Sequence, residues 1–457
     1  MKQKKFTLLC LWGLFLLAGT GAGYAQGADW AREQRIYEWF VSGRGDSIHA
    51  AFSPKLRAKL TPAVFNDTFR QTERTFGKLK SQGGWQTESA AGMTVHYCEL
   101  EFERYRLRLL LAFDADGSLN TLRLVPAPAP DAASAVPSAD ADAVKLPERE
   151  VTLGADGFKL PGMLTLPRAA VADDARKVPC VVLVHGSGPN DRDETLGPNK
   201  PFRDLAHGLA ARGIAVIRYD KRTKVYGAAC VPEGRVLDYD TEAVDDALAA
   251  VAFARSLPEV AADSVYVLGH SLGGTLAPRI AERSDGLAGI LLLAGMARPM
   301  EDALVEQVAY LASLAGDASA AEEQLAELKR QVANVKLLGT PSFDEQVPLP
   351  LNLPRSYWEA ANAYKPVQVA ARLSLPICVL QGERDYQVTM EDFACWRFGL
   401  WRSKNACFKS YPKLNHLLQE GTGKSTPFEY NRASTVPAYV LDDIAAFLHG
   451  VRILADR

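Results

Sequence analysis

A serine between glycines is the strongest chemical signal in the chain. Residues 269–274 read G-H-S-L-G-G, which fits the pattern G-x-S-x-G with Ser271 at its centre. The motif follows the apolar run S-V-Y-V-L (264–268) and precedes a stretch of helical character, so we expect a tight turn between a strand and a helix. Such a turn needs glycine on both sides because a Cβ would clash there. The pattern predicts Ser271 as a nucleophile; the alternative is an ordinary turn that happens to hold a serine.

A serine hydroxyl becomes reactive when a base takes its proton and a carboxylate orients that base. With a turn of this type, the partners follow along the chain in the order serine, acid, histidine. The apolar run P-I-C-V-L (376–380) leads into Q-G-E-R-D, where Asp385 stands at the place expected for the acid. Glu383 is its rival, and Asp392 is a more distant one.

The base should come from a loop after the following strand. His416 ends the segment F-K-S-Y-P-K-L-N-H (408–416), which has the pattern of a strand followed by a loop. The only other histidine after Ser271 is His449, which lies in an apolar C-terminal stretch where a capping or solvated role is expected. The sequence therefore predicts a triad of Ser271, Asp385 and His416.

Two backbone N–H groups should stabilise the negative charge that develops on the substrate oxygen. One belongs to Leu272, directly after the nucleophile. The other should come from H-G-S-G-P (185–189), after the apolar run V-P-C-V-V-L-V (178–184). We predict Ser187 as this donor, because the glycines beside it let the backbone approach a ligand. A phosphate-binding loop is the alternative, but no Lys-Ser or Lys-Thr pair follows.

Two charged clusters, D-R-D-E (191–194) and D-K-R (220–222), follow neighbouring strands. They are either solvated loops or an ion-pair network that fixes the glycine-rich loop. Since both clusters should emerge at the same edge of the sheet, we predict that Arg222 makes a bidentate contact with Asp191 or Asp193.

The segments around these residues alternate between apolar runs of strand length and amphipathic stretches. Strands are predicted over 178–184, 214–219, 264–270 and 289–294, and helices over 202–213, 240–255 and 275–283. This alternation indicates the α/β class, with a doubly wound, mostly parallel sheet covered on both faces. Residues from about 296 to 370 interrupt it and predict a helical cap. Its Tyr357, Trp358 and Tyr364 either line an acyl pocket or pack on the core.

The chain divides into four predicted segments. Residues 1–25 combine a basic start, an apolar stretch and small residues, which is typical of a cleaved secretory signal; an uncleaved anchor is the alternative. Residues 26–126 predict a small α+β domain, with helical spacing followed by alternating strands. The Ala/Pro/Asp-rich residues 127–147 predict a linker, and 148–450 the catalytic domain. We therefore expect an exported protein, periplasmic or secreted.

Composition excludes several classes of protein. With 52 Lys+Arg against 54 Asp+Glu, the formal net charge of −2 offers no basic surface for nucleic acid or an anionic membrane. No C-x-x-C or H-E-x-x-H motif occurs, so we predict neither a metal nor another cofactor. Seven cysteines are too few for a disulfide scaffold, although Cys230, Cys395 and Cys407 could include one bridge.

Four motifs together resemble bacterial α/β-hydrolases of the EstD esterase type. They are H-G-S-G-P-N-D-R-D-E (185–194), G-P-N-K-P-F-R-D-L-A (197–206), R-Y-D-K-R-T (218–223) and G-H-S-L-G-G (269–274). The resemblance covers roughly 148–450 and implies an α/β-hydrolase fold and a serine carboxylesterase related to serine aminopeptidases and acyl hydrolases. It carries the triad onto Ser271, Asp385 and His416. Residues 26–126 are similar in pattern to nuclear-transport-factor-2-like modules.

The expected function is hydrolysis of a small-molecule carboxylic ester through an acyl-enzyme. A peptidase or acyltransferase with the same triad is the alternative, and a non-catalytic binding protein is less favoured because the triad and the oxyanion loop are intact. An aminopeptidase would need a carboxylate that binds the substrate amine, for which Asp344, Glu345 and Glu359 are candidates.

Overall fold

The computed structural model describes residues 30–57, 62, 65, 68–90, 93–103, 106–127, 146–171, 176–314 and 318–451. The predicted signal (1–25) and nearly all of the predicted linker (127–147) lie outside these residues. The chain forms two compact units, Met1–Asp131 with Ala312–Gln324, and Ala132–Leu311 with Leu325–Arg457. Each unit is described by itself below.

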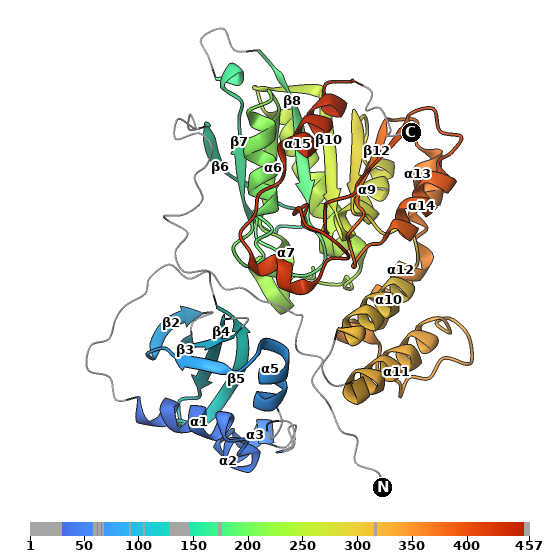
Figure 1. The fold of residues 1–457 in the computed structure, drawn as a ribbon. Coiled ribbons are helices and arrows are strands. Elements are labelled where there is room, and N and C mark those ends of the chain that lie inside the picture. Colours follow the sequence, from blue (N-terminus) through green and yellow to red (C-terminus); the bar gives the residue numbers. More distant parts are fainter. Residues whose placement is uncertain are drawn as a thin grey trace. The chain divides into compact units, whose positions relative to one another are not determined.

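The larger unit is built on an eight-stranded sheet (Figure 1). Its strands are β6 (Glu148–Leu153), β7 (Leu160–Thr165), β8 (Val178–Val184), β9 (Ala215–Tyr219), β10 (Val260–His270), β11 (Gly289–Leu293), β12 (Ile377–Gly382) and β13 (Ala406–Tyr411). They lie in the order β13-β12-β11-β10-β8-β9-β7-β6. Only the pairings of β7 with β6 and β9 are antiparallel. The doubly wound, mostly parallel sheet is therefore confirmed.

Helices cover both faces of this sheet. They are α6 (Pro201–Ala210), α7 (Arg222–Tyr226), α8 (Asp245–Ser256), α9 (Leu272–Arg283), α13 (Pro366–Arg372), α14 (Met390–Gly399) and α15 (Ala438–Leu448). Side chains of α6 and α15 form one core with the strands, and those of α8, α9, α13 and α14 form a second core on the other face. Because both faces are covered, strands such as β8 and β11 are apolar throughout.

The predicted cap leaves the sheet after β11 and returns at β12. It contains α10 (Met300–Ser313), α11 (Ala318–Val335) and α12 (Arg355–Ala363). Short 3₁₀ turns complete this unit at Arg168–Ala170, Gly227–Ala229, Pro350–Asn352 and Pro427–Asn431. A π-helical turn, Asp240–Val244, precedes α8, so the helix predicted over 240–255 begins with this wider turn.

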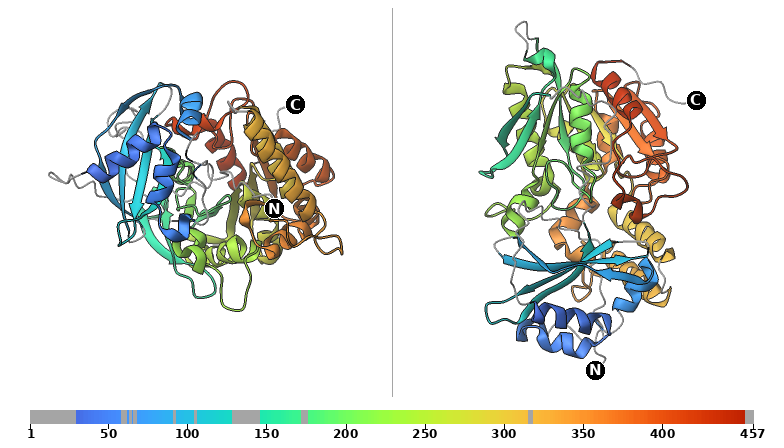
Figure 2. Two further views of the ribbon diagram at one scale, coloured as in Figure 1. Left: turned by 90° about the horizontal axis from the view of Figure 1, so that it is seen from below. Right: turned by 60° about the vertical axis from the view of Figure 1, so that its left-hand side comes forward.

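The smaller unit combines helices with an antiparallel sheet, as predicted. The helices are α1 (Ala31–Val41), α2 (Gly45–Ala51), α3 (Pro54–Arg57) and α5 (Thr68–Phe76), and the strands are β1 (Leu79–Gln82), β2 (Gln86–Ala90), β3 (Met93–Phe102), β4 (Arg106–Phe113) and β5 (Leu119–Pro126). Helices α1 and α2 lie on one face of the sheet (Figure 2), where Phe40 and Ile48 pack with Leu100 and Leu109.

Two strands of this unit were not predicted from the sequence. Both β1 (L-K-S-Q) and β2 (Q-T-E-S-A) pair with β3, but they are mostly polar and lack the alternation that predicts a strand. In the described part of the chain, no helix has both the length and the apolar character needed to cross a bilayer.

Candidate active site

Ser271 stands at a strained turn between β10 and α9. Its φ of 53° and ψ of −117° are rare for a residue with a side chain. A Cβ on Gly269 would lie 2.0 Å from the carbonyl oxygen of Gly273, and a Cβ on Gly273 would lie 2.1 Å from that of Val184. Only glycine fits at either position, so the spacing of the motif has a direct steric cause. The turn sets Ser271 at the N-terminus of α9.

The predicted acid and base form a buried pair. Nδ1 of His416 lies 2.6 Å from Oδ2 of Asp385, and both side chains are buried. Oδ1 of Asp385 accepts the backbone N–H groups of Gln387 and Val388 at 2.7 and 3.1 Å. These donors hold the carboxylate as an acceptor, so Nδ1 of His416 donates to it. Nε2 is then the nitrogen that is free to exchange a proton with a reacting group.

The residues that the sequence left as alternatives have other partners. Glu383 is exposed and accepts a hydrogen bond from the hydroxyl of Ser410. Asp392 is fully buried and pairs with Arg298. His449 ends α15, and its Nε2 contacts a backbone carbonyl oxygen.

His270, the residue directly before Ser271, contacts the predicted base His416. Nε2 of His270 lies 2.9 Å from the carbonyl oxygen of His416, and their rings are 4.7 Å apart. The hydroxyl of Ser271 itself makes no hydrogen bond with any residue that the structure describes. Contacts between a nucleophile and its base are often long in ligand-free proteins and tighten when substrate binds.

The loop after β8 approaches the serine closely. A Cβ on Gly186 would lie 3.1 Å from the Cβ of Ser271 and 3.6 Å from its Oγ. The N–H of Gly186 is already taken, because it donates to Oε1 of Glu194 at 2.7 Å. Within the described residues, the backbone N–H groups of Ser187 and Leu272 have no hydrogen-bond partner. The N–H of Gly186 is therefore already engaged within the protein, whereas those of Ser187 and Leu272 are not.

A buried ion pair joins the loop to the turn. Oε2 of Glu194 lies 2.8 Å from Nδ1 of His270. Burial, the largest single effect, raises the pKa of Glu194, but the charge and hydrogen bond of His270, the charge of His185 and the N–H of Gly186 together outweigh it and lower that pKa. Burial, the largest single effect, lowers the pKa of His270, but the charge and hydrogen bond of Glu194, the carbonyl oxygen of His416 and the charge of Asp385 together outweigh it and raise that pKa above 6.5. Both ring nitrogens of His270 therefore donate, one to Glu194 and one to the carbonyl oxygen of His416.

The predicted partner of Arg222 is wrong. Arg222 is fully buried and binds Asp246 on α8, with Nε 2.5 Å from Oδ2 and Nη2 2.6 Å from Oδ1. Arg222 is the first residue of α7, and its guanidinium stacks over the ring of Phe158 on the side of α8. It reaches neither Asp191 nor Asp193, because the helix directs its side chain away from the glycine-rich loop.

The predicted ion-pair network around the glycine-rich loop is present, but other residues form its pairs. Arg218 donates to Asp193 at 2.8 Å, and Arg192 holds Asp220 through two nitrogens at 3.1 Å. Lys221 is buried, and its Nζ lies 2.9 Å from the carbonyl oxygen of Gly186. The sequence showed that both loops are rich in charged residues. Which residues form ion pairs depends on the side of the loop that each side chain faces, and the sequence does not reveal this.

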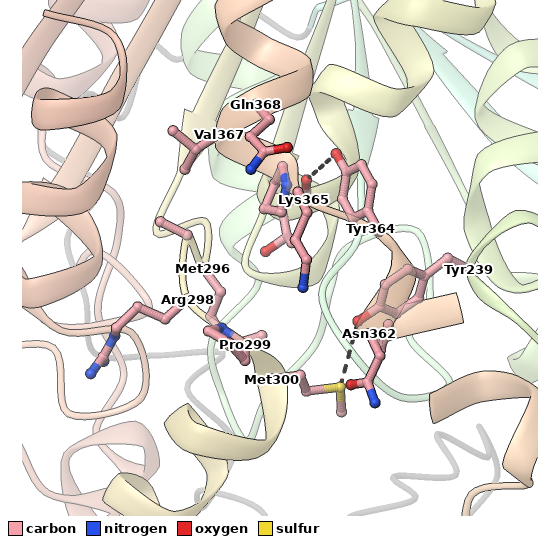
Figure 3. A pocket seen from close by; sticks show the side chains of 14 residues that line it. Tyr239, Met296, Arg298, Pro299, Met300, Asn362, Tyr364, Lys365, Val367 and Gln368 are labelled. Atoms are coloured by element: carbon pink, nitrogen blue, oxygen red, sulfur yellow. Dashed lines mark hydrogen bonds between the residues drawn. The ribbon is translucent and has the colours of Figure 1, made fainter. Parts of the chain in front are cut away.

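A cavity of about 160 Å³ lies between α9, the segment after β11 and the α12–α13 corner (Figure 3). Tyr364 lines it, and its hydroxyl donates to the carbonyl oxygen of Thr275, one turn after the serine. Met296 and Met300 line it as well, whereas the predicted triad does not. Of the three cap aromatics, Tyr357 and Trp358 are buried in packing, and Tyr364 lines this cavity.

The described cysteines form no disulfide with one another, so the bridge considered among Cys230, Cys395 and Cys407 is absent from the residues that the structure describes. Cys378 and Cys407 lie side by side on β12 and β13, in register with each other. Within the same residues, no group of histidine, cysteine and acidic side chains could hold a metal ion.

A comparison with known protein families finds a match in each of the two units. A family model described as serine aminopeptidase, S33, matches residues 178–422. A second model, described as a protein of unknown function (DUF3887), matches residues 34–122.

Individual relatives include esterase EstD of Thermotoga maritima. It is 35% identical over 396 residues, which are 87% of this chain and 89% of the relative. Among solved structures, Est1E from Butyrivibrio proteoclasticus is 18% identical, with a TM-score of 0.42, and covers 66% of this chain and 98% of its own. An esterase of Pyrococcus furiosus is 15% identical, also with a TM-score of 0.42, over 67% of this chain and 92% of its own.

Proposed function

The chain belongs to the serine aminopeptidase S33 family, and from this premise we propose that it is a serine hydrolase that cleaves carboxylic esters of small molecules. The observation that carries the proposal is the buried Asp385–His416 pair beside a strained turn that exposes Ser271. The relative that matches along nearly the whole chain is an esterase by name, which favours esters as the substrates.

In the proposed mechanism, the hydroxyl of Ser271 attacks the ester carbonyl while Nε2 of His416 takes its proton. Asp385 holds the imidazole in place and stabilises the charge that it gains. The N–H groups of Ser187 and Leu272 bind the oxyanion. His416 then gives the proton to the departing alcohol, leaving an acyl group on Ser271. A water molecule, deprotonated by the same histidine, releases the acid and restores the enzyme.

A serine peptidase or acyltransferase is the second candidate, since the family model is described as an aminopeptidase. An aminopeptidase needs a free carboxylate for the amine of its substrate. The cap candidates are less suitable than their sequence suggested, because Arg355 pairs with Glu359 at 2.7 Å and with Glu345 at 3.7 Å. Asp344 is exposed and bonds its own loop through Gln346. The ester reading is therefore preferred, and a non-catalytic binding protein is the least favoured reading.

A substrate panel tests the proposal. The wild-type protein should hydrolyse a short p-nitrophenyl ester much faster than an aminoacyl anilide, and a fluorophosphonate should label it. The Ser271→Ala protein should lose labelling and nearly all turnover, leaving only the trace that oxyanion binding provides. Preference for the anilide would favour the peptidase. Unlabelled, inactive wild-type protein would favour a binding function.

We further propose that residues 1–25 direct export and are removed, so that the enzyme works in the periplasm or outside the cell. The basic, apolar and small-residue segments of this stretch support the proposal. We also propose that residues 26–126 form a separate domain, since their described part has a sheet and an apolar core of its own. N-terminal sequencing of the protein from cell fractions tests the export, with a mature chain expected to begin near Gln26.

A further inference from the structure

A buried lysine binds the peptide group on which the proposed oxyanion site depends. Nζ of Lys221 lies 2.9 Å from the carbonyl oxygen of Gly186, and Lys221 is 2% exposed. The same carbonyl oxygen also accepts from the side-chain amide of Asn190 at 3.2 Å. A charged donor in a buried site makes a stronger hydrogen bond than a neutral one. Lys221 is therefore the dominant partner of this carbonyl group.

The carbonyl group of Gly186 and the N–H of Ser187 belong to one peptide unit. In a planar trans peptide, these two groups point in opposite directions. A cation that fixes the carbonyl oxygen consequently fixes the direction of the N–H. The same hydrogen bond draws electron density toward the oxygen and makes the N–H a stronger donor. The N–H of Ser187 has no partner among the described residues, so this effect is available to a bound ligand.

Gly186 is held on its other side too. Its own N–H donates to Glu194 at 2.7 Å, and Glu194 pairs with His270 next to the nucleophile. The two peptide units that meet at Gly186 are thus fixed by opposite charges, a carboxylate on the N–H and an ammonium on the carbonyl oxygen. Glycine has the most conformational freedom of any residue, so this position needs such restraints most.

Lys221 is connected to the cap. Its Nζ lies 2.5 Å from Oε1 of Glu242, and the hydroxyl of Tyr357 donates to the other oxygen of Glu242 at 2.5 Å. Tyr357 lies on α12, within the cap, and is buried. Burial first and the charge of Glu242 second raise the pKa of Tyr357 well above 10, so its hydroxyl remains a donor. A chain of contacts therefore leads from α12 to the peptide unit of Ser187.

From this geometry we propose that Lys221 is a positioning residue of the oxyanion site, which orients and polarises the Gly186–Ser187 peptide, and that Glu242 and Tyr357 link it to the cap. The proposal rests on the proposed ester hydrolysis. Lys221 touches no substrate atom and acts through the peptide unit alone. Its removal should weaken binding of the transition state while leaving binding of the ground-state ester unchanged.

The test compares Lys221→Met with Lys200→Met. Lys200 pairs with Asp193 of the loop, whereas the contact to the carbonyl oxygen of Gly186 comes from Lys221, so Lys200 is a matched control. For Lys221→Met, we expect kcat toward a p-nitrophenyl ester to fall about 10- to 100-fold with KM within about twofold. The inhibition constant of a trifluoromethyl ketone, whose serine adduct carries an oxyanion, should rise by the same factor. Lys200→Met should change neither quantity.

Two further variants keep the test decisive. Lys221→Met/Glu242→Gln leaves no unpaired buried charge, so it should fold even if the single variant does not, and it should show the same loss of kcat. Tyr357→Phe should give a smaller loss in the same direction. The proposal is overturned if folded Lys221→Met or the double variant keeps the wild-type kcat, or if only KM rises. Wild-type protein without esterase activity would instead refute the proposed function itself.

Discussion

Nδ1 of His270 lies 2.8 Å from Oε2 of Glu194, in a region where both side chains are buried. The pair joins the nucleophile turn to the loop after β8, because Glu194 also accepts the N–H of Gly186. A buried pair of this kind is strongly destabilising to break, since removal of one partner leaves the other charge uncompensated. It also makes stability depend on pH in a direction that the pKa shifts determine.

The pKa of Glu194 is lowered below 4.5, so its contribution to stability is present above that pH and is lost as pH falls through the folded-state pKa. The pKa of His270 is raised above 6.5, so its contribution is complete below that pH and is lost as pH rises through the folded-state pKa. The pair should therefore stabilise the protein most at about pH 5–6.

Melting temperatures of wild type and Glu194→Gln across pH measure this effect. The gap between the two should be largest at about pH 5.5 and should narrow as the pH rises through the folded-state pKa of His270. Glu383→Gln, at an exposed carboxylate in the same unit, is the control and should melt with the wild type throughout. A gap that widens with rising pH would contradict the assignment of a charged His270.

Replacement of Asp385 by Asn should lower kcat by on the order of 10⁴-fold, because the imidazolium of His416 loses its partner and its tautomer is no longer fixed. Glu383→Gln is again the matched control, two residues away, where the carboxylate accepts a hydrogen bond from Ser410. Steady-state kinetics on one activated ester are sufficient. If Glu383→Gln proves the damaging change, the assignment of the acid is wrong.

Gly273→Ala should prevent stable folding. The new Cβ would lie 2.1 Å from the carbonyl oxygen of Val184, and this backbone atom in the central sheet cannot move aside. We expect a loss of about 4 kcal/mol or more, seen as insoluble protein or a large drop in melting temperature. Gly84→Ala is the comparison, since no atom lies within 4 Å of its Cβ position. Its change should stay within about 0.5 kcal/mol, and an equal loss at both sites would refute the steric argument.

Arg222→Met should lower stability rather than kcat. It leaves Asp246 buried and unpaired, which costs about 3–5 kcal/mol. Arg222→Met/Asp246→Leu removes both charges and should recover much of that loss, with kcat near that of the wild type in the folded protein. Denaturant unfolding and ester kinetics on both proteins provide the measurements. If the folded double variant instead shows a lower kcat, Arg222 contributes to catalysis and this prediction is wrong.

The sequence was most informative where chemistry leaves few choices. The limits of β8 were predicted to the residue, because an apolar run between two turns can serve only as a buried strand here. The residues proposed for catalysis all follow strands, and the sheet order brings Asp385 and His416 together. Their roles remain predictions that the variants above test.

The sequence was a poorer guide to which acidic residue each basic residue binds. Arg222, Arg218 and Lys221 stand within five residues of one another, yet they bind Asp246, Asp193 and Glu242 respectively. Which partner each one meets depends on the direction of a side chain at a strand end or helix start, and periodicity carries no such information. The role of Glu194 was hidden for the same reason, since its partner His270 is 76 positions away.

The return of the chain to the sheet has a consequence for how such enzymes diversify. The cap leaves the sheet after Leu293, the last residue of β11, and the chain returns at Ile377, the first residue of the adjacent parallel strand β12. The excursion therefore starts and finishes at adjacent strands, and doubling its length costs only about 0.6 kcal/mol of loop entropy. Evolution is free to exchange this segment among lineages, and engineers can graft another in its place, provided that the contact made by Tyr357 is rebuilt.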